Sequence, residues 1–331
     1  MNRILILALS LGTVAAAQET SPPTIVDNLA AEGERIAALM STDVARDFAG
    51  RAVHLPVPSQ RTLYRDAETG AYVLPDEWAS LDADARAALE SVELPADQYY
   101  TTKYGTPMAY ARVVELMGLH GVTSLEGKRV LDYGYGTIGH LRMMASMGAE
   151  TVGIDVDRFL PALYSEAGDL GDVENPSGAP GRTSIVTGRW PASKPVIEEV
   201  GGGFDVFTSK NTLKRGYVHP SRDADPSTLI DLGVGDAGFL AALHDCLEPG
   251  GLVVIYNICP PQNPADKPYI PWADGQSPFT RAQWDAAGFD VLAFSVVDDE
   301  PTRALATALG WGANMDVETS LHGWYTITRR R

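Results

Sequence analysis

From residue 108 to its end, the chain alternates between helical segments and short runs rich in β-branched and aromatic residues. This alternation predicts a sheet of mostly parallel strands, since parallel neighbours are joined by crossover helices. Such a sheet is covered by helices on both faces. The expected strands are 129–133, 151–155, 184–187, 204–209, 251–258, 289–297 and 323–328, and the main expected helices are 108–119, 140–147, 237–247, 280–287 and 302–309.

The residues before this alternation divide into two parts. Residues 1–17 combine a positive charge at Arg3, an apolar run over 4–16 and small residues at 15–17, which is typical of a secretory signal peptide. The run is shorter than the roughly 20 residues that span a bilayer, and no later segment is long and apolar enough to do so. We therefore expect an exported protein, periplasmic or secreted, and a cytoplasmic one if the signal interpretation is wrong. Apolar residues at helical spacing predict a helical N-terminal cap over 18–100, before a main domain over 101–331.

Charge and cysteine content exclude several classes of function. The chain has 26 Lys+Arg against 43 Asp+Glu, a formal net charge of −17, which would repel a nucleic-acid backbone. Cys246 and Cys259 are its only cysteines, too few for a disulfide framework or a zinc cluster built mainly from thiolates. The histidines show no metal-ligand spacing. We expect neither a nucleic-acid partner nor a metal site.

A glycine-rich turn directly follows the first strand of the alternation. Gly134, Gly136 and Gly139 fit G-x-G-x-x-G, and Asp155 ends the next expected strand. Glycines let a ligand approach the backbone closely, and this spacing between strand and helix is typical of a dinucleotide site. Asp132, however, lies two residues before the first glycine. A carboxylate there disfavours a pyrophosphate and favours a cation, such as an amino group or a sulfonium.

In this context, residues 130–139 resemble motif I of class I S-adenosylmethionine-dependent methyltransferases, with the acidic residue before the glycines. Ile138 stands where the family's pattern places a further glycine. The resemblance covers residues 100 to 331. Other segments similar to the family's strands and turns are Gly153-Ile154-Asp155, Gly203-Phe204-Asp205-Val206-Phe207, Leu247-Glu248-Pro249-Gly250-Gly251 and Trp284-Asp285-Ala286-Ala287-Gly288-Phe289.

The resemblance implies an α/β fold with a Rossmann-like seven-stranded sheet, mostly parallel with an antiparallel last strand. It implies S-adenosyl-L-methionine as cofactor and methyl transfer to a small or medium-sized acceptor, and leaves the oligomeric state open. Asp132 would face the methionine amine, the glycine turn would pass under the cofactor, and Asp155 would bind the ribose. The expected cofactor contacts are Tyr104, Asp132, Gly134, Tyr135, Gly136, Gly139, Asp155, Val156 and Ser209.

The loop after strand 204–209 is the expected substrate side of the site. It is rich in cations for so acidic a chain, and it lies where the family places substrate contacts. Lys210, Asn211, Tyr217 and His219 are therefore the candidate catalytic residues, with His219 as the base because its unperturbed pKa lies near neutrality. The N-terminal cap would close over the substrate. A solvated basic loop is the alternative interpretation.

Two further functions remain open at this point. The literal G-x-G-x-x-G spacing is also found in NAD(P)-dependent oxidoreductases. The export signal favours a non-catalytic protein that binds a nucleoside-like ligand outside the cytoplasm, where S-adenosylmethionine should be scarce.

Overall fold

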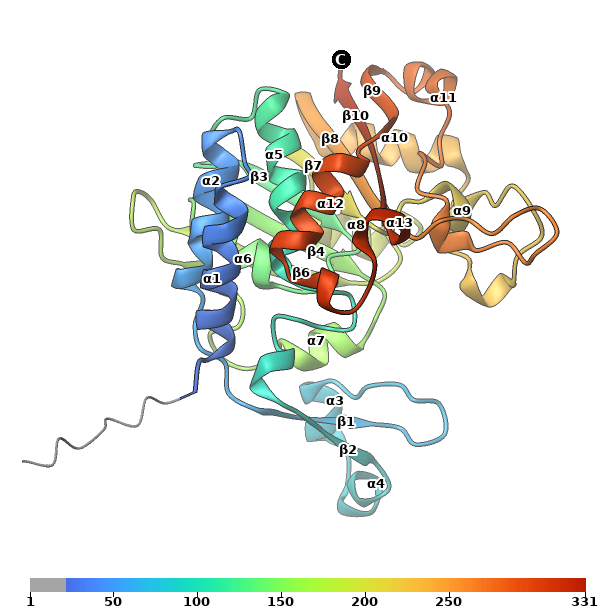
Figure 1. Ribbon diagram of the computed structural model, residues 1–331. Helices are drawn as coiled ribbons and strands as arrows, with labels where there is room; N and C mark the ends of the chain where they lie inside the picture. Colours follow the sequence, from blue (N-terminus) through green and yellow to red (C-terminus); the bar gives the residue numbers. More distant parts are fainter. Residues whose placement is uncertain (1–21) are drawn as a thin grey trace, which may run out of the picture.

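An eight-stranded sheet runs through the protein, with the strand order β5-β6-β4-β3-β7-β8-β10-β9 (Figure 1). The computed structural model describes residues 22–331, so the expected signal peptide lies outside the described residues. The strands are β3 (Arg129–Tyr133), β4 (Glu150–Asp155), β5 (Gly171–Val173), β6 (Gly181–Thr187), β7 (Phe204–Lys210), β8 (Leu247–Cys259), β9 (Phe289–Val297) and β10 (His322–Arg330).

The predicted sheet is confirmed, with one added strand. β6, β4, β3, β7 and β8 pair in parallel, and β10 lies antiparallel between β8 and β9. The eighth strand, β5, pairs antiparallel with β6 at the edge of the sheet. Its three residues are too few to show an alternating pattern, and the surrounding glycines and prolines indicated only a loop.

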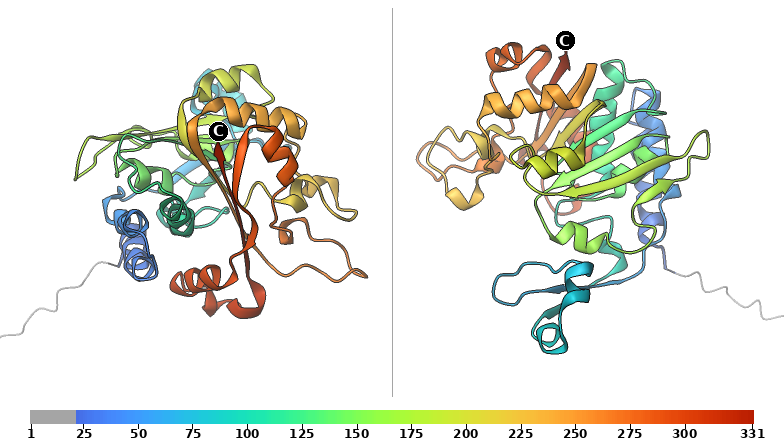
Figure 2. Two further views of the ribbon diagram at one scale, coloured as in Figure 1. Left: turned by 90° about the horizontal axis from the view of Figure 1, so that it is seen from above. Right: turned by 180° about the vertical axis from the view of Figure 1, so that it is seen from behind.

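Helices cover both faces of the sheet. Successive residues of a strand point to opposite faces, and here the residues on both faces are apolar. In β3, Val130 packs into one apolar core and Leu131 into the other. The first core also contains residues of α1 (Ile25–Ala37), α2 (Asp43–Gly50), α5, α6, α7 and α12. The second contains residues of α8, α10 and α11, and the right-hand view of Figure 2 shows the molecule from behind. These helices are α5 (Ala111–Leu119), α6 (Gly139–Ala145), α7 (Phe159–Leu163), α8 (Lys194–Val200), α10 (Asp236–Cys246), α11 (Arg281–Ala286) and α12 (Asp299–Ala308); α9 (Arg215–Val218) and α13 (Val317–Ser320) are single turns.

The N-terminal region is not a purely helical cap. α1 (Ile25–Ala37) and α2 (Asp43–Gly50) pack beside α5, but the following residues form an antiparallel pair of strands, β1 (Arg61–Arg65) and β2 (Glu90–Leu94). The short helices α3 (Pro75–Ser80) and α4 (Ala83–Ala87) connect these strands. Five-residue strands carry too little periodicity to be recognised in the sequence. The pair of strands β1 and β2 lies with its two short helices beside α7, as Figure 1 shows.

One buried carboxylate joins the N-terminal helices to the main domain. Glu115 on α5 accepts hydrogen bonds from the backbone N–H and the hydroxyl of both Ser41 and Thr42, which immediately precede α2. The bond from Ser41 N is 2.8 Å long and that from Thr42 Oγ1 is 2.7 Å long. Burial alone would raise the pKa of Glu115, but these bonds outweigh it and hold the pKa below its usual value.

We predict that Glu115→Gln lowers the free energy of unfolding by about 2 kcal/mol at pH 7, because a charged hydrogen-bond acceptor is lost. A lowered native pKa contributes stability above the unfolded pKa, and that stability disappears as the pH falls through the native pKa. The difference from the wild type should therefore shrink below about pH 4. Urea denaturation across this pH range measures it, with the exposed Glu34→Gln on α1 as control. A difference that does not change with pH would contradict this role.

Candidate functional site

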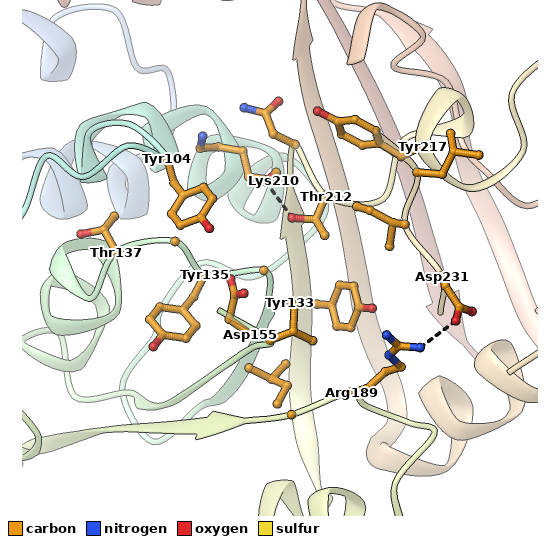
Figure 3. A pocket seen from close by; sticks show the side chains of 18 of the residues that line it. Tyr104, Tyr133, Tyr135, Thr137, Asp155, Arg189, Lys210, Thr212, Tyr217 and Asp231 are labelled. Carbon is orange, nitrogen blue, oxygen red and sulfur yellow. Dashed lines mark hydrogen bonds and ion pairs between the residues drawn. The ribbon is translucent and has the colours of Figure 1, made fainter. Parts of the chain in front are cut away.

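A cavity of about 540 Å³ lies at the carboxyl ends of the central strands. The strand order changes direction at β3, which has β4 on one side and β7 on the other. Open α/β sheets bind ligands at such a point, and this volume is in the range of small-molecule sites. Its walls come from the loops after β3, β4, β6 and β7 and from residues within 104–110 and 227–231 (Figure 3).

The glycine turn forms one wall of this cavity. Gly134 and Gly136 both line it and have φ angles of +79° and +57°, which residues with a side chain rarely adopt. A Cβ on Gly134 would overlap the Thr212 side chain, and a Cβ on Gly136 would lie 2.6 Å from Cβ of Tyr104. Gly139 begins α6 and packs against Pro107, away from the cavity lining. The first two glycines therefore shape the cavity, and the third serves packing.

The structure does not bring Asp132 to the cavity. The side chain is fully buried and is not part of the lining. Its Oδ2 accepts hydrogen bonds from the Tyr110 hydroxyl at 2.9 Å and from Nε2 of His140 at 2.7 Å, and its Oδ1 accepts one from the Thr208 hydroxyl at 2.6 Å. The expected contact with a ligand's amine is therefore replaced by three contacts within the protein.

His140 is the residue of this network that sequence reasoning missed. Its ring is fully buried and stacks on Tyr110, with 3.5 Å between the ring centroids. Burial lowers the pKa of His140, and the hydrogen bond to Asp132 opposes this only in part. The imidazole is therefore neutral near pH 7, and we assign the proton to Nε2, which donates to the carboxylate.

Lys210 is the last residue of β7, and its side chain lines the cavity. Its side chain is only 7% exposed, and Nζ lies 5.1 Å from the centroid of the Tyr110 ring. Burial lowers the pKa of Lys210 to about 8, against the opposing effect of the Asp132 charge, and the nearby Lys214 lowers it further. Sequence reasoning selected this residue, and the structure adds that its amine loses its charge near pH 8.

Asp155 ends β4 at the cavity, where the resemblance implied a ribose-binding acid. Its carboxylate accepts the backbone N–H of Asp157 at 3.0 Å. Burial raises the pKa of Asp155, and backbone hydrogen bonds partly oppose the rise. The next residue, Val156, is exposed and also lines the cavity. Asp155 is thus a carboxylate that can accept hydrogen bonds from a ligand.

Tyrosines form much of the remaining wall. Tyr104 packs over Gly136, and its hydroxyl donates a hydrogen bond to Asp157. Together with Tyr104, the tyrosines in the lining are Tyr110, Tyr133, Tyr135 and Tyr217. None of residues 22–103 lines the cavity, so the described part of the N-terminal region does not close over it, contrary to our expectation.

Of the other candidates in β7 and the loop after it, Asn211 lines the cavity, whereas Ser209 and His219 do not. Asn211 lines the cavity with a φ of +65°, held there because its Oδ1 accepts the backbone N–H of Ile258 at 2.7 Å. Ser209 is buried and donates to the carbonyl of Tyr133, outside the lining. His219 is exposed and pairs with Asp236 at 2.8 Å, also outside the lining. The structure therefore does not place the expected histidine base at the site.

An ion pair on the far wall was not anticipated from the sequence. Arg189, after β6, contacts Asp231 at 2.6 Å, and both residues line the cavity (Figure 3). The only sign of Arg189 in the sequence was its position just after an expected strand.

Within residues 22–331 there is no cluster of His, Cys, Asp and Glu that could hold a metal ion. Over the same residues, no helix has the length and apolar character needed to cross a bilayer.

We predict that Thr208→Val lowers the free energy of unfolding by about 1–3 kcal/mol, because the buried Asp132 loses a hydrogen-bond donor. Thr328→Val is the matched control: Thr328 is equally buried in the same sheet, but its hydroxyl has no hydrogen-bond partner among the described residues. The control should leave the stability unchanged or raise it, because a buried hydroxyl without a partner is replaced by a methyl group. Urea denaturation followed by circular dichroism measures both, and equal losses would contradict the role assigned to Thr208.

No family model matches the chain, and no curated protein matches it. Among solved structures, it is similar to the [4+2]-cyclase SpnF, with a TM-score of 0.39 and 16% identity over 66% of this chain and 80% of that one. It is also similar to Haemonchus contortus phosphoethanolamine N-methyltransferase 2, with a TM-score of 0.39 and 15% identity over 73% of this chain and 62% of that protein, less than two thirds of its length. A third is a methyltransferase from Thiobacillus denitrificans in complex with S-adenosylhomocysteine, with a TM-score of 0.35 and 17% identity over 68% and 92% of the two chains. These values are too low to transfer an activity, so function is assigned from the residues of the cavity.

Proposed function

We propose that the cavity binds S-adenosyl-L-methionine and that the protein transfers its methyl group to a small acceptor. The observation that carries this proposal is Asp155, a carboxylate at the end of β4 that lines the same cavity as the glycine turn. An acid in this position can accept hydrogen bonds from ribose hydroxyls. Next to it, Ile154 and Val156 supply an apolar surface suited to a nucleoside base.

The beginning of α6 favours this cofactor over a dinucleotide. A pyrophosphate binds to free N–H groups at a helix N-terminus. Here the N–H of Gly139 donates to Oγ1 of Thr137 at 3.2 Å, and Gly139 is packed against Pro107 outside the cavity lining. This N–H group is therefore not free to bind the phosphate of an NAD(P)-dependent oxidoreductase.

The residues of the cavity are suited to hold and orient the reactants. When bound, the cofactor supplies a methyl group on a positively charged sulfur. The tyrosine faces of the wall can attract such a cation, as Tyr104 and Tyr110 illustrate by lying close to Lys103 and Lys210. A largely apolar wall excludes water and strengthens these interactions. Holding two reactants in line accounts for much of the rate enhancement that such a transfer requires.

Cavity size and net charge limit the acceptor. The volume of about 540 Å³ has to hold both the cofactor and the group that receives the methyl, which favours a small acceptor. The formal charge of −17 argues against nucleic acid.

We predict that Asp155→Asn raises the dissociation constant of S-adenosylhomocysteine about tenfold or more, because the loss of charged hydrogen bonds costs about 1.5–3 kcal/mol. Calorimetric titration with S-adenosylmethionine, S-adenosylhomocysteine and NAD⁺ measures it. The control is Asp172→Asn, which removes an exposed carboxylate on β5 that pairs only with Arg182 at the surface. If the wild type binds neither adenosyl compound, the proposal is wrong.

We also propose that the protein is exported. This proposal is supported by the positive charge, apolar run and small residues of 1–17, which are typical of a secretory signal peptide. Expression of the full chain in a bacterial host should yield a protein that begins at Gln18 in the periplasmic or secreted fraction. Intact-mass spectrometry of each fraction tests this. A cytoplasmic protein that retains Arg3 would contradict it.

A further inference from the structure

The amine of Lys210 is a buried cation that forms no ion pair with the described residues of the protein. Within residues 22–331, no carboxylate oxygen lies within 4.0 Å of its Nζ, although the side chain is only 7% exposed. Buried ammonium groups are costly unless they are paired. The position of Lys210 in the cavity wall means that a ligand can supply the missing partner.

The charges around Lys210 make this end of the cavity suited to an anion. Asp132 on β3 lies behind it, saturated by donors from Tyr110, His140 and Thr208. His140 on α6 is neutral, and Lys214, after β7, directs its own amine to the carbonyls of Ile258 and Trp272 at 2.7 and 3.0 Å. The remaining charged groups of the cavity wall are Asp155 and the paired Arg189 and Asp231.

We propose that Lys210 binds a carboxylate of the ligand, so that this end of the cavity takes an anion where the motif predicted an ammonium group. The carboxylate has two possible sources: the amino-acid end of the cofactor, or an acidic acceptor. The choice of nucleoside probes rests on the proposed function, but the pairing of Lys210 with a carboxylate does not.

This pairing couples binding to proton uptake. In the free protein the amine loses its charge above about pH 8. A bound carboxylate raises the pKa of Lys210, so that above this pH the amine takes a proton from solvent as the ligand binds. The affinity is therefore constant well below pH 8 and falls as the pH rises, by up to tenfold per pH unit, until the pKa of the complex is reached.

The full chain is titrated by calorimetry at pH 7 and 9.5, in buffers of different ionisation enthalpy, to count the protons taken up. The probes are S-adenosylhomocysteine, 5′-methylthioadenosine, which lacks the amino-acid group, and benzoate. We expect S-adenosylhomocysteine to bind about thirtyfold more weakly at pH 9.5 and to take up close to one proton there. 5′-Methylthioadenosine should show neither effect.

Three variants separate ion pairing from a structural role. Lys210→Met should weaken the binding of S-adenosylhomocysteine about tenfold at pH 7 and abolish proton uptake. Lys210→Arg retains its charge at all accessible pH values, so it should keep the affinity at pH 9.5 and take up no proton. Lys194→Met, which removes an exposed lysine on α8, is the control.

Each outcome decides the proposal. If S-adenosylhomocysteine binds without any proton uptake that depends on Lys210, benzoate is added to the protein saturated with S-adenosylhomocysteine and must show this proton uptake. That result would identify an acidic acceptor as the source of the carboxylate. Absence of uptake with both probes overturns the role of Lys210. If neither nucleoside binds, the methyltransferase proposal fails on its own, and benzoate titrated into the free protein still decides whether Lys210 binds a carboxylate.

Discussion

The buried carboxylate of Asp132 is the interaction around which the candidate site is built. Its three donors come from the turn before α5, from α6 and from β7, so one side chain joins the elements on either side of the central strand. A charge with no exposure to water is tolerated only with such partners. The same charge lies behind Lys210 and partly offsets the burial of that amine. The chemistry at this end of the cavity thus depends on a group that does not line the cavity.

Local patterns predicted the sheet, while long-range contacts determined the site. Strands 129–133 and 289–297 have the expected bounds. The role of Asp132 could not be predicted, since Tyr110 lies 22 residues before it and Thr208 lies 76 residues after it. The same holds for Arg189 and Asp231, which are 42 residues apart. A motif places a side chain on an element, but its partners depend on the packing of other elements.

Lys210 and His219 show which sequence signal was the better guide to the cavity. His219 was selected for its intrinsic pKa, yet it follows a single turn of helix at the surface, where Asp236 pairs with it. Lys210 has an ordinary pKa far from neutrality in water. Because Lys210 ends a buried central strand, its side chain lines the cavity, and burial lowers its pKa to about 8. Position in the sheet therefore mattered more than residue type.

The contact between Glu115 and the residues before α2 also has a consequence for the order of folding. Ser41 lies 74 residues before Glu115, and a ribosome adds residues from the N-terminus onward. α1 and α2 are therefore complete long before the carboxylate that anchors them has been synthesised. Until α5 emerges, these two helices can pack only on each other, and the apolar surface that faces α5 stays open to chaperones and proteases. The native packing of these N-terminal helices thus waits for residues that are synthesised later.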